Sequence, residues 1–188
     1  TIEPSSWGQG RMMGGGSASQ PPAGWKADHE REEGGLRVTL RLEDAPEYVF
    51  DLSRAAGPVS MRSQMVTAVS VHCASGGGWR RMSSVIHAAK GTSAWLRWVA
   101  KINKERVHDP ILDHSQVTGL DFIAFRKHLR EEPTARTGRP LREHTVLEYL
   151  SAVTMILLEF PRLQANTRSE LRKRVGGGPP PVAPVKRY

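Results

Sequence analysis

Cysteine is almost absent from this 188-residue chain, which contains Cys73 alone. A single cysteine cannot form an internal disulfide, and no paired-cysteine spacing is present to hold a metal ion, so a reducing cytoplasm is the expected compartment. His72 and His87 do not complete a ligand set with it. No apolar run approaches the roughly 20 residues of a membrane span, and the N-terminus lacks the charged-then-apolar pattern of a secretion signal. We therefore expect no metal site and no membrane partner.

Motifs of several enzyme classes are also missing. The sequence has no glycine-rich phosphate loop of the G-x-x-x-x-G-K-[ST] form, no metal-binding pair of histidines and no nucleophile elbow. These absences indicate that the chain is not itself an enzyme. We expect neither a cofactor nor a small-molecule substrate.

Positive charge is abundant and unevenly distributed. Residues 1–60 carry a net charge of −3 and residues 61–188 a net charge of +11, which together give the +8 of the whole chain. The whole chain has a pI of about 10.1. A basic domain of this kind is typical of proteins that meet nucleic acid or an acidic surface. The alternative is a helix surface that is merely well solvated.

Four regions follow from composition and periodicity. Residues 1–35 combine glycine runs, prolines and apolar residues without period, which predicts disorder. Residues 36–60 alternate apolar and polar side chains around a turn-forming cluster, which predicts a β-hairpin that must pack against helices. Residues 61–175 have apolar residues at helical spacing, and residues 176–188 are a Gly/Pro linker. The predicted fold is mainly α-helical, a small bundle preceded by a disordered N-terminus and a short hairpin.

Two helix patterns dominate the basic part of the chain. Thr118 stands three residues before Asp121, so a hydroxyl and a carboxylate can satisfy N–H groups of the first turn of a helix that ends at Pro133. The second pattern covers residues 137–160 and is the most apolar of the chain. Cations lie on the outward side of the first helix and around the start of the second, where backbone N–H groups also favour an anion.

Three further features give local predictions. Residues 91–93 are expected to interrupt or bend a helical path that ends near Asn103. Trp95 and Trp98, three residues apart beside other apolar residues, are expected in the core, with stacking on bases as the alternative. Thr167 with Glu170 predicts a second capping box, which would open a short basic helix over residues 168–175.

At these helices the sequence resembles the core-binding, SAM-like domain of tyrosine recombinases, the phage-integrase family. The runs SQVTGLDFIAFRKHLREE and GRPLREHTVLEYLSAVTMILLEF are similar to the second and third helices of that domain. The upstream run GTSAWLRWVAKINKE is similar to its first helix. The resemblance covers roughly residues 79–175, and from it we expect residues 61–175 to be a core-binding helical DNA-binding domain.

The resemblance implies a partner and a role. The partner would be double-stranded DNA, gripped together with other recombinase protomers during site-specific integration or recombination. Catalysis in that family uses a second domain with arginines, a lysine, histidines and a tyrosine nucleophile, and none of its motifs occurs here. We therefore expect this chain to bind DNA without cutting it. The Gly/Pro linker also leads us to expect that the natural protein continues beyond Tyr188.

The expected DNA contacts form one basic surface on the predicted second helix, the loop after it and the start of the third helix. A weaker contribution is expected from the first helix. The candidate residues are Arg126, Lys127, Arg130, Arg139, Arg142, His144, Thr145 and Lys101. Two other functions remain open at this point: a helical adaptor whose basic face meets an acidic protein, and an orphan regulator of a mobile element that does not cut DNA.

Overall fold

The computed structural model describes residues 35–44, 47–74, 77–134 and 137–175. The predicted disorder of residues 1–34 and the predicted linker of residues 176–188 lie outside these described residues. In chain order the elements are β1 (Arg37–Leu40), β2 (Tyr48–Asp51), α1 (Val59–Cys73), α2 (Met82–Glu105), the short 3-10 helix η1 (His114–Gln116), α3 (Gly119–Glu131), α4 (Glu143–Leu158) and α5 (Ala165–Val175). The predicted fold class, mainly helical with a short hairpin, is confirmed.

The hairpin is part of the same core as the helices. β1 and β2 pair antiparallel with Val38 opposite Phe50, and both side chains are buried in one hydrophobic cluster with apolar residues of the helices. At the end of the ladder, Arg37 and Asp51 form an ion pair of 3.0 Å. Because two strands alone are marginal in water, the shared core explains why this hairpin is stable.

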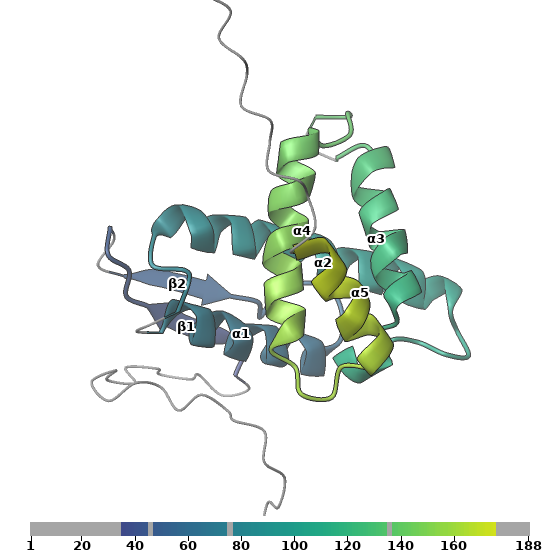
Figure 1. Ribbon diagram of the computed structural model, residues 1–188, viewed down its shortest axis with the longest axis horizontal. Coiled ribbons are helices and arrows are strands. Elements are labelled where there is room, and N and C mark those ends of the chain that lie inside the picture. The colour runs from purple at the N-terminus through teal and green to yellow at the C-terminus, as the bar shows by residue number, and fades with distance from the viewer. Residues whose placement is uncertain (1–34, 45–46, 75–76, 135–136, 176–188) are drawn as a thin grey trace, which may run out of the picture.

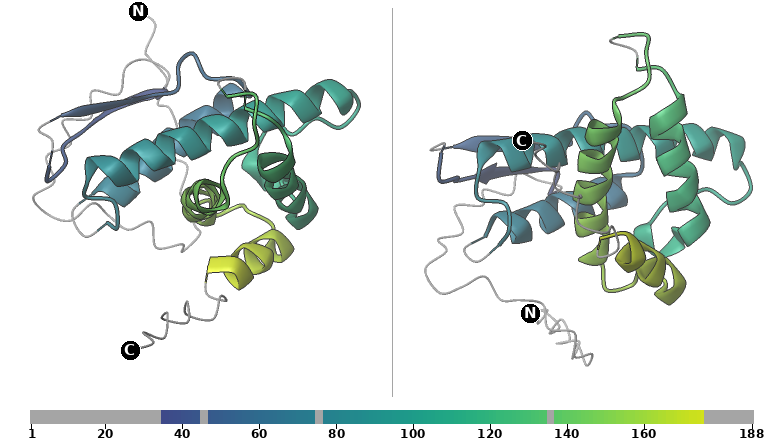
Figure 2. Two further views of the ribbon diagram at one scale, coloured as in Figure 1. Left: turned by 90° about the horizontal axis from the view of Figure 1, so that it is seen from above. Right: turned by 45° about the horizontal axis from the view of Figure 1, so that its top comes forward.

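The long helix α2 is the centre of the bundle. In Figure 1, α4 crosses in front of α2, and α3 runs beside α4. The short helix α5 lies against the lower ends of α3 and α4, while the hairpin lies at the left of Figure 1 and α1 extends beneath α2 from the hairpin toward η1. Seen from above in Figure 2, α4 is viewed along its axis beside α3, so these two helices form one layer across α2.

Aromatic rings fill the junction between α2 and α3. Trp95 meets Phe125 edge-on, with ring centroids 5.0 Å apart, and Trp98 lies 5.1 Å from Trp95. Both tryptophans are buried, so the prediction that they pack in the core is confirmed. Rings of this size bury a large apolar area, which fixes α3 firmly on α2.

The predicted interruption at residues 91–93 is wrong, because α2 continues through them from Met82 to Glu105. Gly91 lies where α2 and α4 cross, and a Cβ at this position would stand 3.1 Å from the carbonyl oxygen of Tyr149. The glycine therefore permits a close approach of two helices, and packing outweighs its poor helix propensity.

Helix starts follow local chemistry in one case and tertiary contacts in another. The capping box of Thr118 and Asp121 is confirmed: each side chain accepts a hydrogen bond from the backbone N–H of the other. The predicted box at Thr167 is wrong. Helix α5 begins earlier, at Ala165, and the buried hydroxyl of Thr167 donates instead to the carbonyl oxygen of Val117 at 2.8 Å.

None of the helices among the described residues has both the length and the apolar character that crossing a bilayer requires. No group of three or more histidine, cysteine or acidic side chains among these residues is arranged to hold a metal ion.

Candidate nucleic-acid interface

The C-terminal end of α3 and the N-terminal end of α4 lie at the same end of the bundle, at the top of Figure 1. The loop between them makes a closed turn, in which the backbone N–H of Thr134 donates to the carbonyl oxygen of Arg139 at 3.0 Å. Gly138 adopts a φ of 62°, which glycine reaches without a steric penalty. We call this region the α3–α4 corner, comprising the described residues among 126–145.

The loop supplies two exposed arginines. Arg139 and Arg142 are exposed, and neither guanidinium has an ion-pair partner among the described residues. Helix α4 begins at Glu143, six residues later than the sequence pattern predicts, so both arginines precede the helix instead of lying on it. Each can therefore reach a ligand without breaking a contact that holds the fold.

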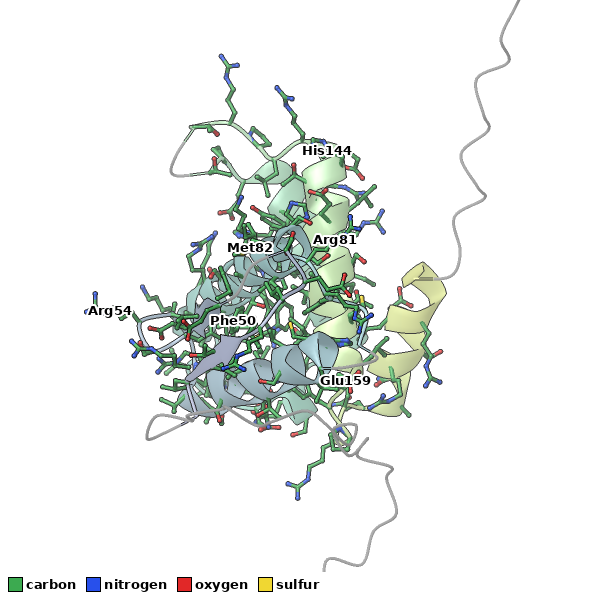
Figure 3. The ribbon with its side chains drawn as sticks, turned by 90° about the vertical axis from the view of Figure 1, so that its left-hand side faces the viewer. Phe50, Arg54, Arg81, Met82, His144 and Glu159 are labelled. Atoms are coloured by element: carbon green, nitrogen blue, oxygen red, sulfur yellow. The ribbon has the colours of Figure 1, made fainter. Side chains whose placement is uncertain are left out.

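The start of α4 has no side-chain cap. Arg142 occupies the N-cap position in an extended conformation. Its guanidinium has donors only, so it cannot accept a hydrogen bond from the first turn of the helix. His144 is exposed at this end of α4, as Figure 3 shows, and its Nε2 lies 3.3 Å from the hydroxyl of Thr145. The first N–H groups of the helix thus face the same corner as the two arginines, where they add positive potential.

Arg130 has a different environment from the one that the sequence suggests. Its guanidinium forms two hydrogen bonds with the carboxylate of Glu143, one of them between Nε and Oε2 at 2.9 Å. These bonds lower the pKa of Glu143 and raise that of Arg130. The pair joins α3 to α4 and neutralises most of the charge that Arg130 would offer to a phosphate.

Other candidate cations on α3 are also close to acids or partly covered. Lys127 is exposed and lies 4.0 Å from Glu131, at the limit of an ion pair. Arg126 is half-buried, with its Nε enclosed, and its charge helps to lower the pKa of Glu143 after the larger effect of Arg130. These two residues belong to the corner, but Lys127 lies near an acid and Arg126 is partly covered.

Lys101 connects α2 to the same corner. Its ammonium group donates to Glu132, which also pairs with His128 at 3.1 Å. The hydrogen bond from Lys101 is the largest influence on Glu132 and lowers its pKa. The candidate Lys101 therefore lies next to α3, where its positive charge is paired with the carboxylate of Glu132.

Helix α2 also carries an exposed cationic stripe. Four cations recur at spacings of seven, four and three residues, which places them on one face of a helix. The stripe comprises Lys90, Arg97, Lys101 and Lys104, all exposed. Arg97 was not among the sequence candidates, although its heptad relation to Lys90 could have revealed it. Its charge acts on Tyr149 of α4, whose pKa is raised by burial and by Glu148 while Arg97 opposes the rise.

The structure therefore divides the candidates into two groups. The loop cations Arg139 and Arg142, which have no ion-pair partner among the described residues, lie with His144 and Thr145 at the corner. The remaining candidates, Arg130, Lys101, Lys127 and Arg126, lie close to acids. An anion that approached this end would meet the loop arginines first and the α2 stripe to the side.

Comparison with known proteins adds no assignment. No protein-family model matches the chain, and neither the curated proteins nor the solved structures contain a match to it.

Proposed function

We propose that this chain binds double-stranded DNA through the α3–α4 corner and the cationic stripe of α2. The proposal rests chiefly on one observation, the pair of exposed arginines, Arg139 and Arg142, on a turn that projects beyond the bundle without acid partners among the described residues. Guanidinium groups suit phosphate because their N–H groups match its oxygens two at a time.

The mechanism is a grip on the DNA backbone. Arg139 and Arg142 would contact phosphates directly, while Lys127 and Arg97 would contribute from the flanks. Contacts of this kind fix the register of a protein on a duplex but do not read its bases. Sequence preference would then come from DNA shape and from a few contacts in the grooves.

The place of this activity in a larger reaction is also a proposal. The proposal carries over the resemblance of the runs in α2, α3 and α4 to the recombinase helices, which implies DNA contact at the α3–α4 loop. We infer that the chain serves as the core-binding arm of a site-specific recombinase and meets other protomers on the DNA.

A salt titration tests the proposal. Fluorescence anisotropy with a labelled duplex of about 30 base pairs should give a slope of log K against log salt near −4, roughly −0.9 for each of about four phosphate contacts. The titration should cover salt concentrations from about 50 to 200 mM. A slope near zero, or binding only at millimolar protein, would contradict the backbone grip.

A second candidate function has its own observation. Leu120 and Ile123 lie three residues apart on α3 and are 77% and 41% exposed. Neighbouring apolar side chains on an outward helix face suit an apolar patch on a protein partner, whereas the adaptor expected from the sequence would meet an acidic protein through its basic face. Leu120→Glu would abolish such an association and leave DNA binding intact, whereas the loop arginine variants would do the reverse.

A further inference from the structure

The outward side of α1 carries no lysine, arginine or acidic residue. Arg62 is the only such residue of the helix, and its guanidinium is held at the hairpin, where it donates to two carbonyl oxygens of the turn after β2. Ser63, Thr67 and Val71 follow one another at spacings of four, so they form a row on one side of the helix, and Thr67 and Val71 are exposed. Surface helices normally carry charged side chains on the side that faces water. An uncharged row of this kind suits contact with another segment of protein.

The row leads into a cavity of about 640 Å³ between α1, η1 and the turn from α4 to α5. Thr67 and Val71 line this cavity together with apolar side chains of the α4–α5 turn, Phe160 and Pro161 among them. Val71 and Pro161 are exposed, so the cavity opens to the surface. Its volume lies within the range of binding sites in proteins and is ample for one large side chain.

The described chain begins beside the same row. A Cβ on Gly35 would stand 3.1 Å from Oγ of Ser63, so the backbone of Gly35 lies against the first residue of the row. Val71 follows Ser63 by eight residues, a distance of about 12 Å along a helix. Residues 1–34 therefore join the fold at one end of an uncharged surface whose other end is the cavity.

Trp25 is the first large apolar side chain upstream of Gly35. Between these two residues the only apolar side chain is the small one of Ala27. Ten residues of extended chain span up to about 33 Å, so Trp25 can reach the cavity with chain to spare. An indole ring buries a large apolar area, and one such anchor can order a segment whose composition predicts disorder by itself.

The charges of the connecting segment suit the edge of the cavity. Arg162 lines the cavity, is exposed and has no ion-pair partner among the described residues. Residues 28–33 contain four acidic residues and one arginine, which gives them a net charge of −3. A segment that runs from Gly35 back to a ring in the cavity would bring these carboxylates near the arginine, with which they can form ion pairs.

We propose that the segment around Trp25 docks on the outward side of α1 of its own chain, with the indole ring in the cavity. The short connection to Gly35 favours this segment over a second copy, because it gives an effective concentration of about 1 mM. A contact with a dissociation constant of about 0.1 mM would then be formed in about nine of ten chains. The docking is independent of DNA binding, since the cavity and the loop arginines lie at opposite ends of α4, marked by Glu159 and His144 in Figure 3.

NMR contacts of the Trp25 ring test the proposal in the natural 188-residue chain. In an isotope-labelled sample, nuclear Overhauser effects should join the indole protons of Trp25 to the methyl groups of Val71, and the ring of Trp7 should show none. In an equal mixture of labelled and unlabelled chains, filtered spectra record contacts between chains alone, and these effects should be absent. No contact between Trp25 and Val71 in the first sample would overturn the proposal. Contacts in the mixture would overturn it in favour of a second copy.

Val71→Glu supplies the variant for a second test, and Val49→Glu is its matched control. Both valines are exposed, at 37% and 49%, and Val49 of β2 does not line the cavity. Docking should slow cleavage by trypsin after Lys26, because the protease acts on the undocked fraction. A carboxylate at position 71 opposes burial of the ring, so cleavage should become about tenfold faster, whereas the control should keep the natural rate.

Circular dichroism on the same samples checks that both variants are folded. If Val71→Glu does not fold, the contacts of Trp25 in the natural chain still decide the question. Equal cleavage rates in the natural chain and the two folded variants would overturn the proposal, and so would equal acceleration in both variants, which would indicate a response to added negative charge.

Discussion

Arg130 of α3 and Glu143 of α4 form a two-point ion pair across the α3–α4 loop. The bond joins the last turn of one helix to the first turn of the next, so it positions the loop arginines between them. It also consumes the charge of a residue whose sequence position suggests a phosphate contact. While it is paired with Glu143, Arg130 therefore positions the loop. If the carboxylate of Glu143 were removed, the guanidinium of Arg130 would become available to a phosphate.

Glu143→Gln should strengthen DNA binding. The substitution removes one negative charge from the corner and releases Arg130, which then becomes available to a phosphate. The slope of log K against log salt should steepen by about 0.9, the value for one added contact. Anisotropy at several salt concentrations measures this slope. Unchanged affinity and slope would show that the corner does not meet DNA.

The loop arginines should carry more of the affinity than any other pair. Arg139→Ala combined with Arg142→Ala should flatten the same slope by about 2 and weaken binding to all sequences alike, because two phosphate contacts are lost. Both side chains are exposed and have no ion-pair partner among the described residues, so helix content should not change. Circular dichroism on the same samples checks this.

Arg54→Ala supplies the matched control for the loop variants. Arg54 is exposed beyond the end of the hairpin, well away from His144 in Figure 3. The substitution removes one positive charge, as Arg139→Ala or Arg142→Ala does singly, while the double loop variant removes two. It should leave the salt slope close to that of the natural chain. An equal loss of affinity in the control and in either loop variant would indicate attraction to net charge and not a defined interface.

Sequence reasoning found those features whose causes are local. The start of α3 was predictable because Thr118 and Asp121 are three residues apart and cap the helix by themselves. The hairpin was predictable from alternation, and the burial of Trp95 from helical spacing. In each case the pattern that makes the element lies within a few residues.

The features that were missed depend on residues far apart in the chain. The partner of Arg130 is thirteen residues away across a loop, and the partner of the Thr167 hydroxyl is fifty residues away. In the sequence alone Gly91 is expected to interrupt a helix. The close approach of the carbonyl oxygen of Tyr149, far away in the chain, explains why a glycine is present inside α2. No local spacing encodes such contacts, so the pairing of candidate cations could not be predicted from the sequence.

Gly91→Ala should destabilise the fold. Alanine is the better helix former by about 1 kcal/mol, but its Cβ would press against the backbone of Tyr149, which cannot move away as a flexible side chain can. The net loss in free energy of unfolding should be about 1–2 kcal/mol. Ser93→Ala, in the same helix, should change it by less than about 0.5 kcal/mol. Urea denaturation measures both, and a stabilised Gly91→Ala chain would show that the crossing is loose.

Stability should fall with acidity in a way that His114 controls. The pKa of this ring is lowered from 6.5 to about 3 in the folded chain, chiefly by burial. Below about pH 6.5 the unfolded chain therefore binds a proton that the folded chain does not. The free energy of unfolding should drop by about 1.4 kcal/mol per pH unit between about pH 6 and pH 4 from this group alone.

The contribution of His114 can be separated from that of the carboxyl groups. Burial raises the pKa of Asp113, but hydrogen bonds from Ser115 and Gln64 lower it on balance, so this group destabilises the fold only at still lower pH. His114→Phe should remove the slope assigned to His114 between about pH 6 and pH 4, whereas substitution of the exposed His108 by Gln should keep it. Urea denaturation at each pH provides the comparison. The same slope in the His114→Phe chain as in the natural one would mean that His114 takes up its proton without unfolding, and that the ring is more accessible to water than its 1% exposure implies.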